Sequence, residues 1–96
     1  MSKGDFSFAT NLKNLEIYGN SLKNIGNHLF EGAEEQLIDI DLQSNRIEKI
    51  SIEAFYGLAK LEKLSLQNNL ISELQTEIFH GLINLKNLIM SSNKLF

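Results

Sequence analysis

Three carboxylates in this 96-residue chain, Glu16, Asp39 and Asp41, have the residue types and spacing that could do chemistry. Asp39 and Asp41 are two residues apart, so on a strand their side chains lie on the same face. Carboxylate oxygens suit Ca²⁺, but this ion takes about six to eight oxygen ligands, and a strand face presents too few. We therefore predict no metal site, and we predict no cofactor.

The two histidines, His28 and His80, are the other candidates for catalysis. Both lie close in sequence to a phenylalanine, and no carboxylate is predicted to accompany both. The chain has no cysteine nucleophile, no Gly-rich phosphate loop and no H-E-x-x-H spacing. We therefore predict that the chain is not an enzyme.

Composition excludes two further classes of function. The net charge is −3 and no stripe of lysine and arginine is present to neutralise phosphates, so no nucleic-acid partner is expected. No apolar run approaches the roughly 20 residues of a spanning helix, so no membrane span is expected within this chain. The absence of cysteine suits a reducing compartment, and it suits an internal piece of a secreted protein equally well.

A repeated pattern must position the candidate residues. The pattern L-x-x-L-x-L-x-x-N-x-L begins at residues 12, 37, 61 and 85, which lie 25, 24 and 24 residues apart. A further apolar residue and then a phenylalanine follow in the first three copies, the phenylalanines being Phe30, Phe55 and Phe79. A fixed step of this kind predicts a stacked solenoid, in which each repeat buries its apolar face against its neighbours.

This pattern resembles the leucine-rich repeat family, in its typical 24-residue, Phe-containing class found in extracellular receptor, adhesion and matrix proteins. The resemblance implies an α/β solenoid, an arc with short parallel strands on the concave face and loops or short helical turns on the convex face. Strands are expected near residues 14–18, 39–43, 63–67 and 87–91. The chain is expected to be one domain, 1–96, made of a partial repeat 1–11, repeats 12–36, 37–60 and 61–84, and a partial repeat 85–96.

Two columns of recurring residues are expected to be structural. The asparagine side chains should bond backbone groups left open where the chain turns out of each strand. The phenylalanines, beginning with Phe6, should stack as filler between the two sides of the solenoid. Gly32, Gly57 and Gly81 are expected in tight or positive-φ conformations. The asparagine ladder consists of Asn20, Asn45, Asn69 and Asn93.

Ligand binding is expected at the variable strand positions, whose side chains should line the concave face. Glu16, Asp39 and Asp41 would form an acidic patch there, which suggests a basic or mixed peptide surface as partner. The alternative is a solvated face, with Lys63 partly compensating Asp39 and with Ile89 either covered by a further strand outside this chain or an isolated apolar residue. The predicted ligand-binding residues are Glu16, Tyr18, Asp39, Asp41, Gln43, Lys63, Ser65, Gln67 and Ile89.

The resemblance thus implies a non-catalytic module that binds a protein or peptide ligand, as part of a receptor, adhesion or matrix protein. The alternative is an intracellular leucine-rich repeat scaffold or regulatory subunit that docks on an enzyme. Both ends of the chain fall within a repeat, so we expect a fragment of a longer array, whose uncapped ends self-associate in isolation. The other interpretations are a short natural protein whose partner covers its ends and a truncated product. A fragment would be extracellular or at the cell surface, and a complete chain would be cytoplasmic.

Overall fold

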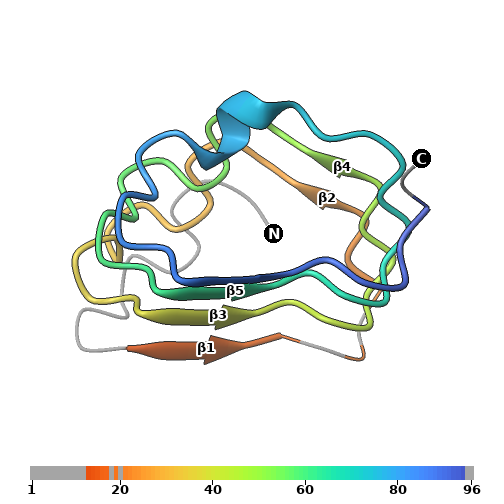
Figure 1. The fold of residues 1–96 in the computed structure, drawn as a ribbon, viewed down its shortest axis with the longest axis horizontal. Coiled ribbons are helices and arrows are strands. Elements are labelled where there is room, and N and C mark those ends of the chain that lie inside the picture. The colour runs from red at the N-terminus through yellow and green to blue at the C-terminus, as the bar shows by residue number, and fades with distance from the viewer. Residues whose placement is uncertain (1–12, 18, 20, 95–96) are drawn as a thin grey trace.

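Each repeat of the chain forms one turn of a coil in the computed structural model, which describes residues 13–17, 19 and 21–94 (Figure 1). One side of the coil is a parallel sheet in the order β1-β3-β5-β6. The predicted strands begin at the correct residues but are two residues shorter, because the chain bends toward a positive-φ residue three positions beyond each strand. The strands are β1 (Asn14–Glu16), β3 (Asp39–Asp41), β5 (Lys63–Ser65) and β6 (Asn87–Ile89).

The register of this sheet follows the repeat step. Leu15, Ile40, Leu64 and Leu88 are aligned in one row across the four strands. Ile40 and Leu64, in the middle of that row, are fully buried. Side chains alternate between the two faces of a strand, so the rows on either side point away from the core. These outward rows are Asn14, Asp39, Lys63 and Asn87, and Glu16, Asp41, Ser65 and Ile89.

The returning segments carry more regular structure than the sequence predicted. A 3₁₀ helix, η1 (Thr76–Phe79), matches the expected short helical turn. Two unpredicted strands, β2 (Asn24–Ile25) and β4 (Lys49–Ile50), form a second parallel sheet. Stacking brings the backbones of successive repeats into hydrogen-bonding range here, and the Ser51 N–H donates to the Ile25 oxygen at 2.9 Å.

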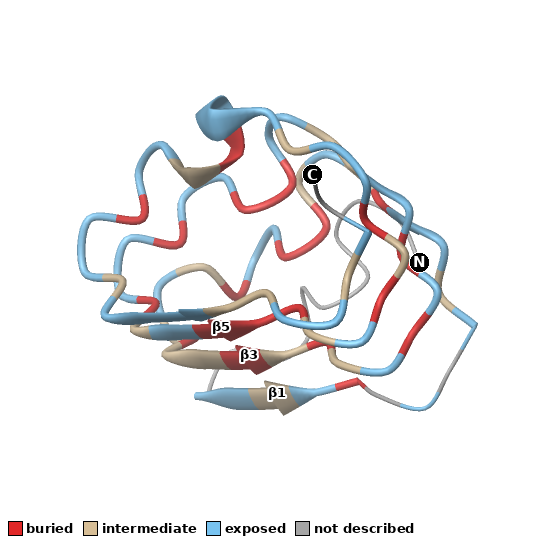
Figure 2. Ribbon diagram, turned by 45° about the vertical axis from the view of Figure 1, so that its right-hand side comes forward, coloured by how far each residue is buried: buried red, intermediate tan, exposed pale blue. Residues whose placement is uncertain are grey.

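Buried residues occur on all sides of the coil (Figure 2), and their apolar side chains form one hydrophobic core. Phe30 and Phe55 are buried and stack with ring centroids 6.1 Å apart, as predicted. Phe79 is half-buried against the same core, and Phe6 lies outside the described residues. In the part of the chain that the structure describes, no helix is long and apolar enough to cross a membrane.

The predicted asparagine ladder is present at the three described positions. The amide nitrogen of Asn69 donates to the backbone oxygens of Leu42 and Leu66, both at 3.0 Å, and its Oδ1 accepts from the Ile47 N–H at 3.1 Å. Asn93 repeats this arrangement one turn later.

Asn45 differs from the other ladder residues at one atom. Its nitrogen donates to the Ile17 oxygen at 2.7 Å, but its buried Oδ1 has no hydrogen-bond partner among the described residues. Asn20, the first predicted member of the ladder, lies outside the described residues. The ladder therefore satisfies buried backbone groups between successive repeats, which is a structural role.

The glycine prediction is confirmed. Gly32, Gly57 and Gly81 have φ values of 97°, 81° and 87°. A side chain is strained in this left-handed region, which explains why glycine recurs after each phenylalanine of the pattern.

Candidate functional site

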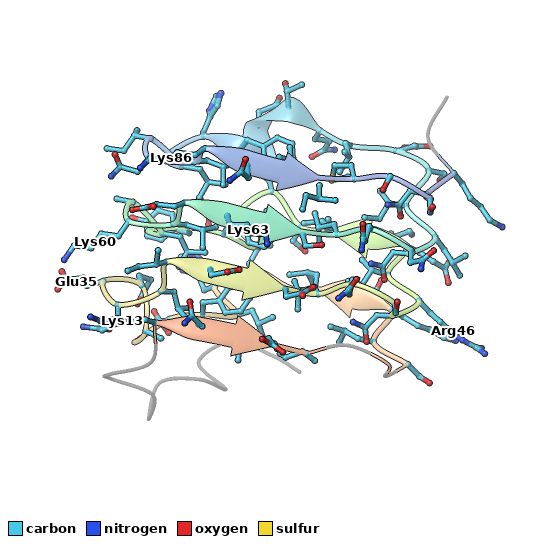
Figure 3. All side chains as sticks on the ribbon, turned by 60° about the horizontal axis from the view of Figure 1, so that its bottom comes forward. Lys13, Glu35, Arg46, Lys60, Lys63 and Lys86 are labelled. Atoms are coloured by element: carbon cyan, nitrogen blue, oxygen red, sulfur yellow. The ribbon has the colours of Figure 1, made fainter. Side chains whose placement is uncertain are left out.

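The outward face of the sheet β1-β3-β5-β6, called here the sheet face, carries the predicted ligand-binding residues. Figure 3 looks onto this face, and Lys63 stands over β5 in its middle. Tyr18 lies outside the described residues. The other predicted residues all come from strand positions or from the two residues that follow a strand: Glu16, Asp39, Asp41, Gln43, Lys63, Ser65, Gln67 and Ile89.

The acidic patch lies at the β1–β3 end of the sheet face. Glu16 is aligned with Asp41 on the neighbouring strand, as predicted. Asp39 is aligned with Lys63, but among the described residues no ion pair joins them, and none joins Glu16 or Asp41 to a lysine or arginine. The negative charge of this patch is therefore not neutralised by a direct salt bridge within the described residues.

A row of hydrogen-bonded side chains, called here the amide row, runs across the strand ends beside this patch. The backbone nitrogen and the side-chain nitrogen of Gln43 donate to the Asp41 carboxylate at 3.1 and 3.2 Å. Gln67 donates to the Gln43 side-chain oxygen at 2.5 Å, and the Ser91 hydroxyl donates to the Gln67 oxygen at 3.4 Å. These four hydrogen bonds, three donated by side chains and one by the Gln43 backbone, are all donated in the direction of the Asp41 carboxylate and hold the row together.

The amide row was not predicted from the sequence. Two glutamines at the same position of successive repeats, 43 and 67, were the signal available in the sequence. Because neighbouring strands lie about 4.8 Å apart, identical amides one repeat apart can bond directly.

Ser65 corrects one expectation about the sheet face. The sequence predicted an accessible side chain, but Ser65 is only 4% exposed. Its neighbours in the same row are Asp41 and Ile89, whose larger side chains flank the small hydroxyl. Ile89 itself is half-buried. A partner bound to the sheet face would therefore contact the two ends of this row, Glu16 and Ile89, more than Ser65 in its middle.

The histidines form no catalytic arrangement within the described residues. His28 Nε2 lies 2.9 Å from a carboxylate oxygen of Glu53, and its ring centroid is 4.7 Å from that of Tyr56. No serine or threonine is hydrogen-bonded to this pair among the described contacts. His80 is exposed. The His28–Glu53 pair therefore joins two repeats at the surface.

Two further observations concern metals and cavities. No group of three or more His, Cys, Asp or Glu side chains in the described ranges could hold a metal ion. An open hollow of about 700 Å³ lies away from the sheet face, beside β4. It is lined by mixed polar and apolar residues: Asn27, Glu48, Lys49, Ile50, Ser51, Ile52, Leu70, Ser72, Glu73 and Gln75.

Comparison with known proteins agrees with this architecture. The family model described as leucine rich repeat matches residues 10–71 and 35–95, which together span most of the chain. The chain belongs to the leucine-rich repeat family. No curated protein sequence matches this leucine-rich repeat chain.

A solved structure is also similar to this leucine-rich repeat chain. That structure is an octameric complex of Latrophilin 3 (Lec, Olf), Unc5D (Ig, Ig2, TSP1) and FLRT2 (LRR). The match, to the leucine-rich repeats of FLRT2, has a TM-score of 0.85 and 38% sequence identity. It covers 96% of this chain and 27% of the matched chain, so this chain spans about a quarter of that protein chain's length.

Proposed function

We propose that this leucine-rich repeat chain is a non-catalytic recognition module that binds a protein or peptide ligand on its sheet face, within a receptor, adhesion or matrix protein. The proposal depends on one observation, the set of side chains that the sheet face presents. Exposed and half-buried side chains of varied chemistry stand there on a backbone that the asparagine ladder bonds from beneath. A rigid support of this kind lowers the entropy lost on binding.

The similarity to FLRT2 supports the same proposal. The leucine-rich repeats of FLRT2 occur in a complex with Latrophilin 3 and Unc5D, so repeats of this kind take part in protein assembly in that case. We extend this from FLRT2 to the present chain at the level of protein recognition. The fragments of Latrophilin 3 and Unc5D named in that complex are accordingly the first probes to use.

The chemistry of the described residues supports a role without catalysis. The His28–Glu53 pair has no nucleophile among its described contacts, and the carboxylates of the sheet face are not gathered into a metal site within the described ranges. General acid–base work requires a group within hydrogen-bond reach of a bound substrate in a water-excluding site. The open sheet face is suited instead to a macromolecular surface.

Surface plasmon resonance with the two probe fragments tests this proposal. The variants are Glu16→Lys and Lys63→Glu on the sheet face, and Glu73→Lys as a control on a returning segment, and all three residues are exposed. We expect at least one probe to bind, the two sheet-face variants to change its dissociation constant, and the control to bind like the wild type. Binding that only the control changes would contradict the sheet face as the site, and binding of neither probe would contradict the extension of these partners to this chain.

A further inference from the structure

We propose that the sheet face takes an extended protein segment that lies across the strands. Its basic side chain lies over Glu16 and Asp41, and an apolar side chain four residues away lies over Ile89. This inference rests on the proposed function, because it specifies the partner chemistry of the same face. Four features of the described residues carry it: charge, an apolar end, a hydrogen-bonding row and the strand spacing.

One end of the row Glu16–Asp41–Ser65–Ile89 is negatively charged. Glu16 is exposed and has no ion pair with a described lysine or arginine, and Asp41 is held in place by its two bonds from Gln43. The two carboxylates stand on neighbouring strands, which lie about 4.8 Å apart. Together they attract a lysine, or an arginine that can form two parallel hydrogen bonds. Asp39 is less available for this role, because Lys63 is aligned beside it.

The other end of the same row is apolar. Ile89 is aligned with Ser65, which is aligned in turn with Asp41. Because Ser65 is buried, the middle of the row offers little contact area, and Ile89 is half-buried. An apolar partner side chain over Ile89 would remove further apolar surface from water. The row therefore favours a partner that is basic at one end and apolar at the other.

The amide row favours an extended partner backbone over a helix. Gln43 and Gln67 each use one side-chain N–H in the bonds within the row, and each amide carries a second N–H. An extended segment has backbone carbonyl oxygens free to accept from such donors, whereas a helix satisfies its own backbone internally. The amide row runs across the strands beside the row from Glu16 to Ile89, so one segment can contact both.

The spacing of the strands sets the spacing in the partner. Three strand steps separate Glu16 from Ile89, about 14 Å at about 4.8 Å a step. An extended chain rises about 3.3 Å per residue and alternates its sides, so residues four apart lie on one side and about 13 Å apart. A lysine or arginine and an apolar residue at this separation match the two ends of the row.

Peptide selection tests the inference. Random dodecapeptides displayed on phage are selected on the immobilised chain, and enriched peptides are synthesised and titrated by fluorescence anisotropy. We expect enrichment of a basic and an apolar residue four apart. Glu16→Lys should weaken binding about three- to tenfold, the effect shrinking at high salt. Ile89→Thr and Ile89→Asp should weaken binding progressively, and the control Glu73→Lys should bind like the wild type. Circular dichroism of each variant verifies that it remains folded.

The outcomes separate this inference from the proposed function. Enriched peptides without a basic residue, whose binding Ile89→Asp still weakens, would overturn the partner chemistry and retain the sheet face as the site. Peptides that bind as helices would overturn the extended segment. Binding unaffected at Glu16 and Ile89 but lost in Glu73→Lys would overturn both proposals. Failure to enrich any peptide would overturn the inference, and binding of the Latrophilin 3 or Unc5D fragment through the sheet face would then still support the proposed function.

Discussion

Asn69→Leu tests the asparagine ladder where its contacts are most fully defined. Asn69 is 4% exposed, and its side chain bonds the backbone of four residues, Leu42, Leu66, Gln67 and Ile47. Leucine fills a similar space but has no polar atom. The substitution therefore removes the hydrogen bonds while the bulk of the side chain stays in place.

The loss in the free energy of unfolding depends on which backbone groups keep a second hydrogen-bond partner in Asn69→Leu. The buried Ile47 N–H loses its side-chain acceptor, which costs about 1 to 3 kcal/mol. The Leu42 oxygen still accepts from Asn45 at 3.0 Å. The Leu66 oxygen still accepts from Asn93 at 2.9 Å. The Gln67 oxygen still accepts from the Ser44 N–H at 3.1 Å. These three carbonyls share the two N–H groups of one amide and each keep another bond, so together their loss costs about 1 to 2 kcal/mol, and the free energy of unfolding should fall by about 3 kcal/mol in total.

Urea unfolding followed by circular dichroism measures this change. Asn87→Leu is the matched control, because Asn87 is an exposed asparagine on β6 with no side-chain hydrogen bond among the described contacts. Its free energy of unfolding should change by no more than about 0.5 kcal/mol. A loss below about 1 kcal/mol in Asn69→Leu, or a loss equal to that of the control, would refute the ladder argument.

Two further predictions concern backbone conformation, and the same urea measurement checks both. Ser44 has a φ of 58°, so Ser44→Gly should raise the free energy of unfolding by about 0.5 kcal/mol, whereas Ser72→Gly, at a residue without positive φ, should lower it by a similar amount. Equal losses in both variants would exclude strain at Ser44. Gly57→Ala and Gly81→Ala should each cost about 1 to 2 kcal/mol, because φ is 81° and 87°. Gly57→Ala should cost more, since a Cβ there would lie 3.2 Å from Cγ of Glu34, and adding Glu34→Ala should remove this extra loss. Equal losses in the two glycine variants, or an extra loss that persists when Glu34→Ala is added, would contradict the steric argument.

The repeat step was sufficient to predict the main sheet. A constant step of 24 or 25 residues determines where each strand lies, how neighbouring strands are aligned and which side chains face the core. Leu64 was predicted to be buried and Lys63 to face outward, and both are found so. The second sheet could not be predicted in the same way. Its strands are two residues long, Asn24–Ile25 and Lys49–Ile50, and two residues carry no alternation to read. Their pairing depends on how closely the repeats stack, which is a property of the whole coil.

The candidate site shows a different limit of sequence reasoning. The facing of Glu16 and Asp41 followed from alternation, but the accessibility of Ser65 did not, because exposure depends on the size of the neighbours across the sheet. The amide row depends similarly on side-chain rotamers, which bring Gln67 into contact with Gln43. The face to which a side chain points follows from its own position in a strand. Its contacts across the sheet depend also on residues about 24 positions away in the sequence.

The asparagine ladder and the amide row are coupled through the same backbone positions. Asn69 donates to the backbone oxygen of Gln67 at 3.1 Å, while the Gln67 side chain takes part in the amide row. Asn45 makes the equivalent contact with the backbone oxygen of Gln43 at 3.3 Å. The ladder thus holds the backbone from which each amide side chain projects. Outward side chains can therefore change the chemistry of the sheet face at little cost to the fold, whereas loss of a ladder asparagine affects both stability and the alignment of the row.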